Sequence, residues 1–299
     1  MINQVTKERI AVLQQHYLVL ARRHPHAIRE LALAEVPEMV FHSNAIENST
    51  LTLEDTEDII MRDKIRHDAS VREVYEAKNL AEVTRLLIES PHQKLTPELV
   101  LSLHRVLLSG ISPRWAGRFR SGDEWVRVGT HVGANPQFTN GLVTELIHRY
   151  NTEDREILAK IAHFHAEFET IHPFGDGNGR IGRALVNQQL MAADFPPIII
   201  RSKNKHQDYY PLFDEYRHRD KYDGFEELFA LALIESLHKR IVTLAGSKVI
   251  SLNEWAKQNN ISVNSANNKA RRQTIPAFRL RDKWFVSAEF KDGDGVEII

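Results

Sequence analysis

Apolar residues recur every three or four positions along most of this chain, which is the spacing of one face of an α-helix. Between residues 156 and 171 five of them repeat at three and four residues and form one apolar face: Ile157, Ile161, Phe164, Phe168 and Ile171. The same period predicts three further helices, which contain Ile10, Leu13, Tyr17, Leu18 and Leu20, then Val74, Ala77, Leu80, Val83 and Leu87 (residues 73–88), then Ile181, Leu185, Val186 and Leu190. We therefore expect a mainly α-helical protein.

Composition narrows the class of protein. The chain has 299 residues, 42% of them hydrophobic and 26% charged, which is typical of a soluble globular protein with one large domain or two smaller ones. No apolar run approaches the roughly 20 residues that span a bilayer, and the first residues do not read as a secretory signal. The absence of cysteine excludes disulfides and thiolate metal sites. We expect a cytoplasmic protein with no membrane partner, and a net charge of -1 argues against strong electrostatic binding of the whole chain to nucleic acid.

One segment, residues 118–136, departs from the helical period. Trp125, Val126, Val128 and Val132 favour extended backbone, and two glycines interrupt them. The segment is therefore predicted to be a short β-hairpin or flap on the helical body. The pattern changes again near residues 245–247, so we expect one domain over 1–245 and a second over 246–299.

The most informative segment is His172 to Arg183, which follows a predicted helix and begins another. Gly175, Gly177 and Gly179 allow a tight turn and close approach to a ligand. Backbone N–H groups of such a turn, at the N-terminus of a helix, form an anion site. The segment thus predicts a phosphate site.

Polar side chains in the same segment supply the remaining chemistry. Arg180 and Arg183 are three residues apart and share a helix face, where two guanidinium groups suit a polyphosphate. Asp176 offers an oxygen ligand for Mg²⁺, and Asn178 can donate a hydrogen bond toward phosphate. His172 can accept a proton near neutral pH. The segment therefore combines a phosphate cradle, a metal ligand and a base.

Other interpretations of this segment fit less well. Gly177, Gly179 and Gly182 have the spacing of a dinucleotide-binding fingerprint, but that motif follows a strand and this one follows a helical pattern. A calcium loop would need an oxygen ligand where Arg180 stands, and no P-loop signature is present. A purely structural turn stays open, although it leaves the convergence of the charged side chains without explanation.

The segment His172-Pro173-Phe174-Gly175-Asp176-Gly177-Asn178-Gly179-Arg180, followed by Arg183, resembles the signature of the Fic (filamentation induced by cAMP) family of AMP-transferring enzymes. The resemblance implies a Fic-type helical bundle with a β-hairpin flap, and ATP with Mg²⁺ as substrate. It implies that His172 takes the proton of a target hydroxyl and that Asp176 holds Mg²⁺. It further implies that Asn178 and the backbone around Gly177 and Gly179 form an anion hole. Arg180 and Arg183 would then bind the β- and γ-phosphates.

The resemblance also implies roles for segments outside the glycine-rich loop. Residues 125–136 stand where the family has a flap that holds a target protein by strand addition, although a plain surface hairpin stays open. Tyr209 and Tyr210 resemble a tyrosine pair near the nucleotide, with core packing as the alternative. Arg217 stands where several relatives place an Asn that contacts adenine, and this departure puts the base contacts in doubt.

Residues 43–48 resemble the inhibitory pattern of the family, a Ser or Thr followed four residues later by Glu. Ser43 and Glu47 fill those positions, as in the class whose inhibitory helix precedes the core, although Ser43 alone could be a helix cap. The resemblance implies that Glu47 pairs with Arg183 and thereby blocks productive ATP binding. In some relatives the same Glu positions a water that removes AMP, so both directions of AMP chemistry stay open.

The C-terminal module, residues 246–299, resembles a small winged helix-turn-helix domain. Basic residues cluster over 255–284 and suit DNA phosphates, although docking to a protein and a solvated basic face are alternatives. The sequence thus leaves a second function open, a DNA-binding regulator whose Fic core senses nucleotide; the intact His172 favours an enzyme. A homodimer is likewise left open.

Overall fold

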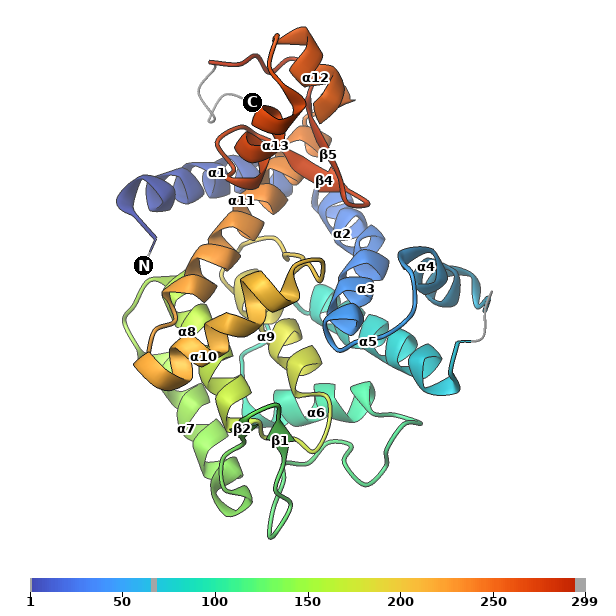
Figure 1. Cartoon of the computed structure of the whole chain (residues 1–299), viewed down its shortest axis with the longest axis vertical. Coiled ribbons are helices and arrows are strands. Elements are labelled where there is room, and N and C mark those ends of the chain that lie inside the picture. Colours follow the sequence, from blue (N-terminus) through green and yellow to red (C-terminus); the bar gives the residue numbers. More distant parts are fainter. Residues whose placement is uncertain (1, 66–68, 294–299) are drawn as a thin grey trace. The chain divides into compact units, whose positions relative to one another are not determined.

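The structure is a computed structural model that describes residues 2–65 and 69–293. The chain forms two compact units, and each is described by itself below. The first consists of residues 33–193 and 199–226, and the second of residues 2–32, 194–198 and those from 227 onward. Helices α2 (Pro25–Ala34) and α11 (Asp223–Leu244), which Figure 1 labels, each have residues in both units. No helix in the described ranges is long and apolar enough to cross a membrane.

The first unit is a helical bundle with one small hairpin. Its elements, in chain order, are α3 (Val36–Ile46), α4 (Leu53–Arg62), α5 (Val71–Glu89), α6 (Pro97–Leu107), β1 (Arg127–Val128), β2 (His131–Val132), the 3-10 turn η1 (Pro136–Phe138), α7 (Thr139–Thr152), α8 (Ile157–Ile171), α9 (Asn178–Ala192), the π-helical turn η2 (Lys205–Tyr209) and α10 (Tyr210–Arg219). Helix α8 packs against α7, α9 and α10, and α9 also packs against α3, α5 and α6. The predicted mainly helical fold is confirmed.

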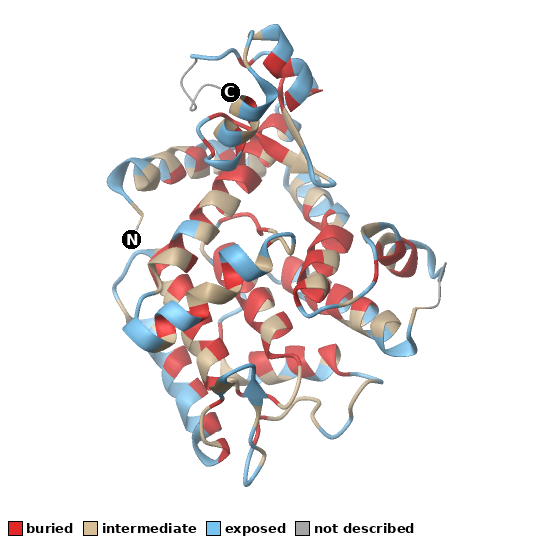
Figure 2. Ribbon diagram, in the orientation of Figure 1, coloured by how far each residue is buried: buried red, intermediate tan, exposed pale blue. Residues whose placement is uncertain are grey.

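Helix α8 shows why the period in the sequence was informative. Its apolar face, with Ile161, Phe164 and Phe168, is almost completely buried (Figure 2). The predicted range 156–171 matches the observed helix, and the range 73–88 matches α5 with a residue or two added at each end. The next helix, expected after the glycine-rich loop with Ile181 among its apolar residues, is α9, which begins at Asn178 inside the glycine-rich segment. Gly177, at φ 81°, ends the loop there, because its backbone turns into the left-handed region.

The predicted hairpin is present and short. Strands β1 and β2 pair antiparallel, with Arg127 opposite Val132 and Val128 opposite His131. Trp125, Val128 and Val132 are exposed. The hairpin is joined to the end of α8, because the N–H of Ala134 donates to the carbonyl oxygen of Ile171 at 3.0 Å. The flap is thus anchored beside the glycine-rich loop.

The second unit contains α1 (Gln4–Arg23), most of α2 and α11, and the C-terminal elements. These last are β3 (Val249–Ser251), α12 (Leu252–Gln258), α13 (Val263–Arg271), β4 (Phe278–Leu280) and β5 (Lys283–Ser287). The strands form an antiparallel sheet in the order β3-β5-β4. Residues 275–277, which precede β4, form a turn closed by the N–H of Ala277 and the carbonyl oxygen of Ile275.

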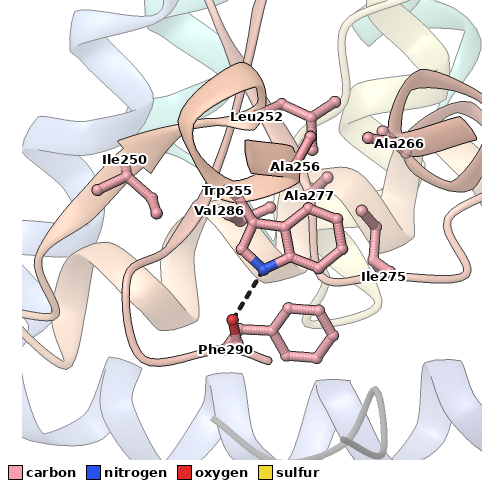
Figure 3. Close-up of a cluster of buried hydrophobic side chains, with 10 residues drawn as sticks. Ile250, Leu252, Trp255, Ala256, Ala266, Ile275, Ala277, Val286 and Phe290 are labelled. Atoms are coloured by element: carbon pink, nitrogen blue, oxygen red, sulfur yellow. Dashed lines mark hydrogen bonds between the residues drawn. The ribbon is translucent and has the colours of Figure 1, made fainter. Parts of the chain in front are cut away.

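The C-terminal elements share a small apolar core around Trp255 (Figure 3). The indole of Trp255 is fully buried, stacks on Phe290 and donates from Nε1 to its carbonyl oxygen at 2.8 Å. Ile250, Ile275 and Val286 complete the packing around it. The core joins two helices to a three-stranded sheet; that this module is a winged helix, and that a domain begins at residue 246, remain predictions.

Candidate active site

The loop between α8 and α9 is fixed by its own side chains. Phe174 is fully buried and lies parallel to the ring of His104, with the ring centroids 3.6 Å apart. Asn178 accepts from the N–H of Phe174 at 2.8 Å and donates to its carbonyl oxygen at 2.9 Å. The amide of Asn178 therefore closes the loop, and its predicted contact with phosphate remains a prediction.

Two buried residues that the sequence did not reveal hold the loop from outside. Arg120, 1% exposed, donates to the carbonyl oxygens of Ile171 and His172 and to those of Glu124 and Ala134. His104 accepts from the N–H of Gly117 at Nδ1, so its proton lies on Nε2, which donates to the carbonyl oxygen of Asp176 at 2.9 Å. A lone Arg or His gives no local pattern by which either role could have been found.

His172 ends α8 in the left-handed region, at φ 52°, a conformation that is uncommon for a residue with a side chain. Its N–H donates to Phe168 at 2.9 Å, and its carbonyl oxygen accepts from Arg120 at 2.8 Å. Burial lowers the pKa of the imidazole to about 4, and the charge of Arg120 acts in the same direction. His172 is therefore neutral at physiological pH and able to accept a proton.

Asp176 and Arg180 are held by charges that the sequence did not single out. One carboxylate oxygen of Asp176 lies 2.5 Å from Arg72 and the other lies 3.0 Å from Arg180. Glu76 pairs in turn with Arg180 at 3.0 Å and with Arg72 at 2.9 Å. Both residues expected to engage nucleotide and metal thus have protein partners in this state, supplied by the first two turns of α5.

Arg183 lies buried against α3. Its Nε donates to the hydroxyl of Ser43 and its Nη2 to the carbonyl oxygen of Ser43, both at 2.9 Å. Nη2 also forms an ion pair with Glu47 Oε1 at 2.8 Å. Burial is the largest influence and raises the pKa of Glu47, but the charge and hydrogen bond of Arg183, with the charges of Arg180 and His172, together outweigh it, so this pKa lies below its ordinary value of 4.5.

Glu47 also lies over the first turn of α9. A Cβ atom on Gly179 would come within 2.1 Å of Glu47 Oε1, so only glycine leaves room for the carboxylate there. Unbonded N–H groups and the helix dipole favour a negative group at this position. The carboxylate of Glu47 thus occupies the place where the N-terminus of α9 and Arg183 would together bind an anion.

The end of α3 that carries Glu47 is tied down by two side chains. Lys205 donates to the carbonyl oxygens of Ala45 and Ile46 at 2.7 and 2.9 Å, and Tyr210 also donates to Ile46. A cation at the C-terminus of a helix is favourable because the last carbonyl groups carry partial negative charge. Lys205 and Tyr210 therefore fix the position of Glu47; the role of Lys205 was not found from the sequence.

The two predicted nucleotide-contacting tyrosines differ in their surroundings. Tyr209 is 2% exposed and its hydroxyl lies 2.8 Å from Nε2 of His165, which matches the packing alternative. Tyr210 is partly exposed beside Glu47. Arg217 lies over the ring of Phe213 and 3.4 Å from Asp214. Nucleotide contacts by either tyrosine stay predictions.

The geometry defines a class of site: a neutral imidazole on a rigid loop, followed at once by a helix N-terminus with buried arginines for an anion. Comparison with known proteins is consistent with this class. A model of the Fic/DOC family matches residues 94–190. "Protein adenylyltransferase Fic" of Nematostella vectensis is 36% identical over 187 residues, which are 60% of this chain and 43% of that protein. "Protein adenylyltransferase fic-1" of Caenorhabditis elegans is 29% identical over 199 residues, 64% of this chain and 38% of that protein.

Solved structures agree in fold. A Fic domain containing signaling protein from Bacteroides thetaiotaomicron superimposes with a TM-score of 0.71 at 24% identity, over 80% of this chain and 98% of that one. A Fic family protein from Desulfovibrio desulfuricans has a TM-score of 0.65 at 23% identity, over 97% and 98% of the two chains. This chain therefore contains a Fic domain and has the Fic fold, while it spans less than half the length of the two named adenylyltransferases.

Proposed function

We propose that this protein is an autoinhibited protein adenylyltransferase, which moves AMP from ATP to a serine, threonine or tyrosine hydroxyl of a target protein. One observation carries the proposal: the neutral base His172 and the buried Arg183 flank the same helix N-terminus, and a carboxylate occupies the anion position between them. The names of the adenylyltransferases that the chain resembles support the same reaction.

In the proposed reaction His172 accepts the proton of the target hydroxyl. The hydroxyl oxygen forms a bond to the α-phosphorus, and the bond from that phosphorus to the β-phosphate oxygen breaks, so that pyrophosphate leaves. Arg183, and Arg180 once it parts from Glu76, would neutralise the charge that builds on the leaving group. The pKa of His172, about 4, keeps the imidazole unprotonated before the target binds.

Asp176 fits a magnesium ion that accompanies ATP. Mg²⁺ is commonly bound through one or two carboxylates together with substrate phosphates, and Asp176 offers a partly exposed carboxylate beside Arg180. When bound, the metal would offset phosphate charge. The carboxylate would first have to release Arg72, which is itself largely exposed.

Glu47 supplies the proposed inhibition. Its ion pair occupies the guanidinium that a γ-phosphate needs, and its carboxylate covers the first turn of α9. ATP would bind weakly, or in a pose unsuited to in-line attack, where a misplacement of about 1 Å costs on the order of a hundredfold in rate. The hairpin β1–β2 would hold the target segment by strand addition, because it is short, exposed and anchored at the end of α8.

Transfer of label tests this proposal. Parent, Glu47→Gly and Glu47→Gly/His172→Ala proteins are incubated with Mg²⁺ and ATP labelled at either the α- or the γ-phosphate, alone and with cell lysate. We expect covalent α-label, without γ-label, on protein only with Glu47→Gly. Adding the parent protein and excess unlabelled nucleotide to targets already labelled by Glu47→Gly measures AMP removal by the parent. Absence of α-label from every protein incubated with Glu47→Gly would refute AMP transfer.

DNA binding by the C-terminal module is a second candidate, favoured by one observation. The exposed face of α13 carries Asn264, Asn268 and Arg271, and this helix contains no acidic residue. Asparagine can pair with adenine edges and arginine with guanine or phosphate. Labelled duplex DNA should then bind the full chain with salt-dependent affinity, and Arg271→Ala should weaken it; equal affinity of the two proteins would exclude this surface.

A further inference from the structure

Glu169 is a buried carboxyl group that the proposed reaction does not use. It lies in the last turn of α8, three residues before His172, and is 7% exposed. Among the described residues its Oε1 has no hydrogen-bond partner. A Cβ on Gly182 would come within 2.4 Å of Oε1, so the carboxyl fills the space that this glycine leaves open on α9.

The other carboxyl oxygen faces the base. Glu169 Oε2 lies 3.8 Å from Nδ1 of His172, and the carbonyl oxygen of Glu169 lies 3.4 Å from the same nitrogen. A carbonyl oxygen can only accept, so this contact favours a proton on Nδ1. The contact is long for a hydrogen bond, and a shift of about 1 Å would give Nδ1 a second acceptor in Oε2.

We propose that Glu169 is a positioning residue, which with its own carbonyl oxygen holds the His172 proton on Nδ1 and leaves Nε2 to the incoming alcohol. The inference rests on the proposed function and adds a residue to its machinery. A histidine in the opposite tautomer would present an N–H to the alcohol and could not accept its proton.

The charge state of the pair agrees with this geometry. Burial raises the pKa of Glu169 to about 8, and burial lowers the pKa of His172 to about 4, so both groups are neutral near pH 7. A neutral carboxyl group has one oxygen that only accepts, which suits Nδ1–H at Oε2, and its O–H then lies at Oε1 above Gly182. Among the described residues, the charged and titratable groups that interact with Glu169 include Arg183, Arg217, Glu47, His172, Tyr209 and Tyr210.

The tautomer can be measured without turnover. ¹⁵N-histidine labelling and long-range ¹H–¹⁵N correlation spectra distinguish Nδ1–H from Nε2–H, and His172→Ala assigns the signals. We expect Nδ1–H in the parent and in Glu169→Gln, whose amide oxygen still accepts. Glu169→Leu should give a mixture, and so should Gly182→Ala, which displaces the carboxyl without removing it. Glu167→Leu, two residues away on α8 and bonded to Tyr216, is the matched control and should leave the tautomer unchanged.

Kinetics in the Glu47→Gly background supply the second measurement. Glu169→Leu should lower kcat by about tenfold to a hundredfold, with the KM for ATP within about threefold, because orientation of the base is lost and nucleotide binding is not. Three results would overturn the proposal. They are an Nε2–H tautomer in the parent, an unchanged tautomer in Glu169→Leu, and a decrease of kcat in Glu169→Gln as large as that in Glu169→Leu. If no protein transfers AMP, the proposed function fails, while the spectra still decide the role of Glu169.

Discussion

Removing the carboxylate of Glu47 should tighten ATP binding, because the nucleotide would no longer have to displace it from Arg183. The Nη2–Oε1 distance is 2.8 Å, and the two side chains are 6% and 42% exposed. A hydrogen bond to a charged group contributes about 1.5–3 kcal/mol when well enclosed. Since Glu47 is partly in solvent, screening reduces this to about 1–2 kcal/mol. At 1.4 kcal/mol per factor of ten, Glu47→Gly should lower the Kd by about 5- to 30-fold.

The substitution is tolerable at this position, because Glu47 is the C-cap of α3 and lies outside the helix interior, where glycine costs most. The measurement is isothermal titration with a non-hydrolysable ATP analogue at low and high salt. Glu47→Gln, which keeps an acceptor without the charge, should fall between parent and Glu47→Gly. Glu82→Gln, the same change at an exposed site on α5, controls for net charge and should match the parent. A Kd for Glu47→Gly within twofold of the parent would refute the reasoning.

Three further predictions concern other parts of the chain. Arg72→Gln should raise the affinity of the complex of protein and ATP analogue for Mn²⁺ by about fivefold, because Arg72 no longer competes with the metal for Asp176. Electron paramagnetic resonance measures this affinity, and an unchanged value would exclude the competition. Hydrogen bonds from Thr50 lower the pKa of Glu73 to about 2, below its ordinary 4.5, so the stability it adds above pH 4.5 should fade toward pH 2. Urea unfolding at pH 7 and pH 3 should then show a smaller pH difference in Glu73→Gln, and an equal one would contradict this. Trp255→Ala should destabilise the C-terminal core by about 3–5 kcal/mol, and Trp255→Phe by less, which thermal unfolding measures; equal melting temperatures for parent and Trp255→Ala would contradict the packing.

The sequence was sufficient to predict those features that a pattern within one short segment specifies. The apolar period of α8 reports burial of one helix face, so its range was predicted almost to the residue. The segment proposed to be catalytic could be recognised because His172, Asp176 and Arg183 lie within twelve consecutive residues. The exact start of α9 was not predicted, because Asn178, the residue that begins it, bonds back to Phe174, and the apolar period does not encode that contact.

What only the tertiary structure decided is which distant charges meet at that segment. Arg72 reaches Asp176 across 104 residues, Arg120 reaches the carbonyl of His172 across 52, and Lys205 reaches the end of α3 across about 160. The family resemblance predicted the pair of Glu47 with Arg183, but residue spacing alone could not, because the contact spans 136 residues and exists only because α3 packs on α9. Long side chains from separate helices find their partners only after the apolar faces have packed, because neither the spacing nor the composition of any one segment specifies the geometry of its neighbours.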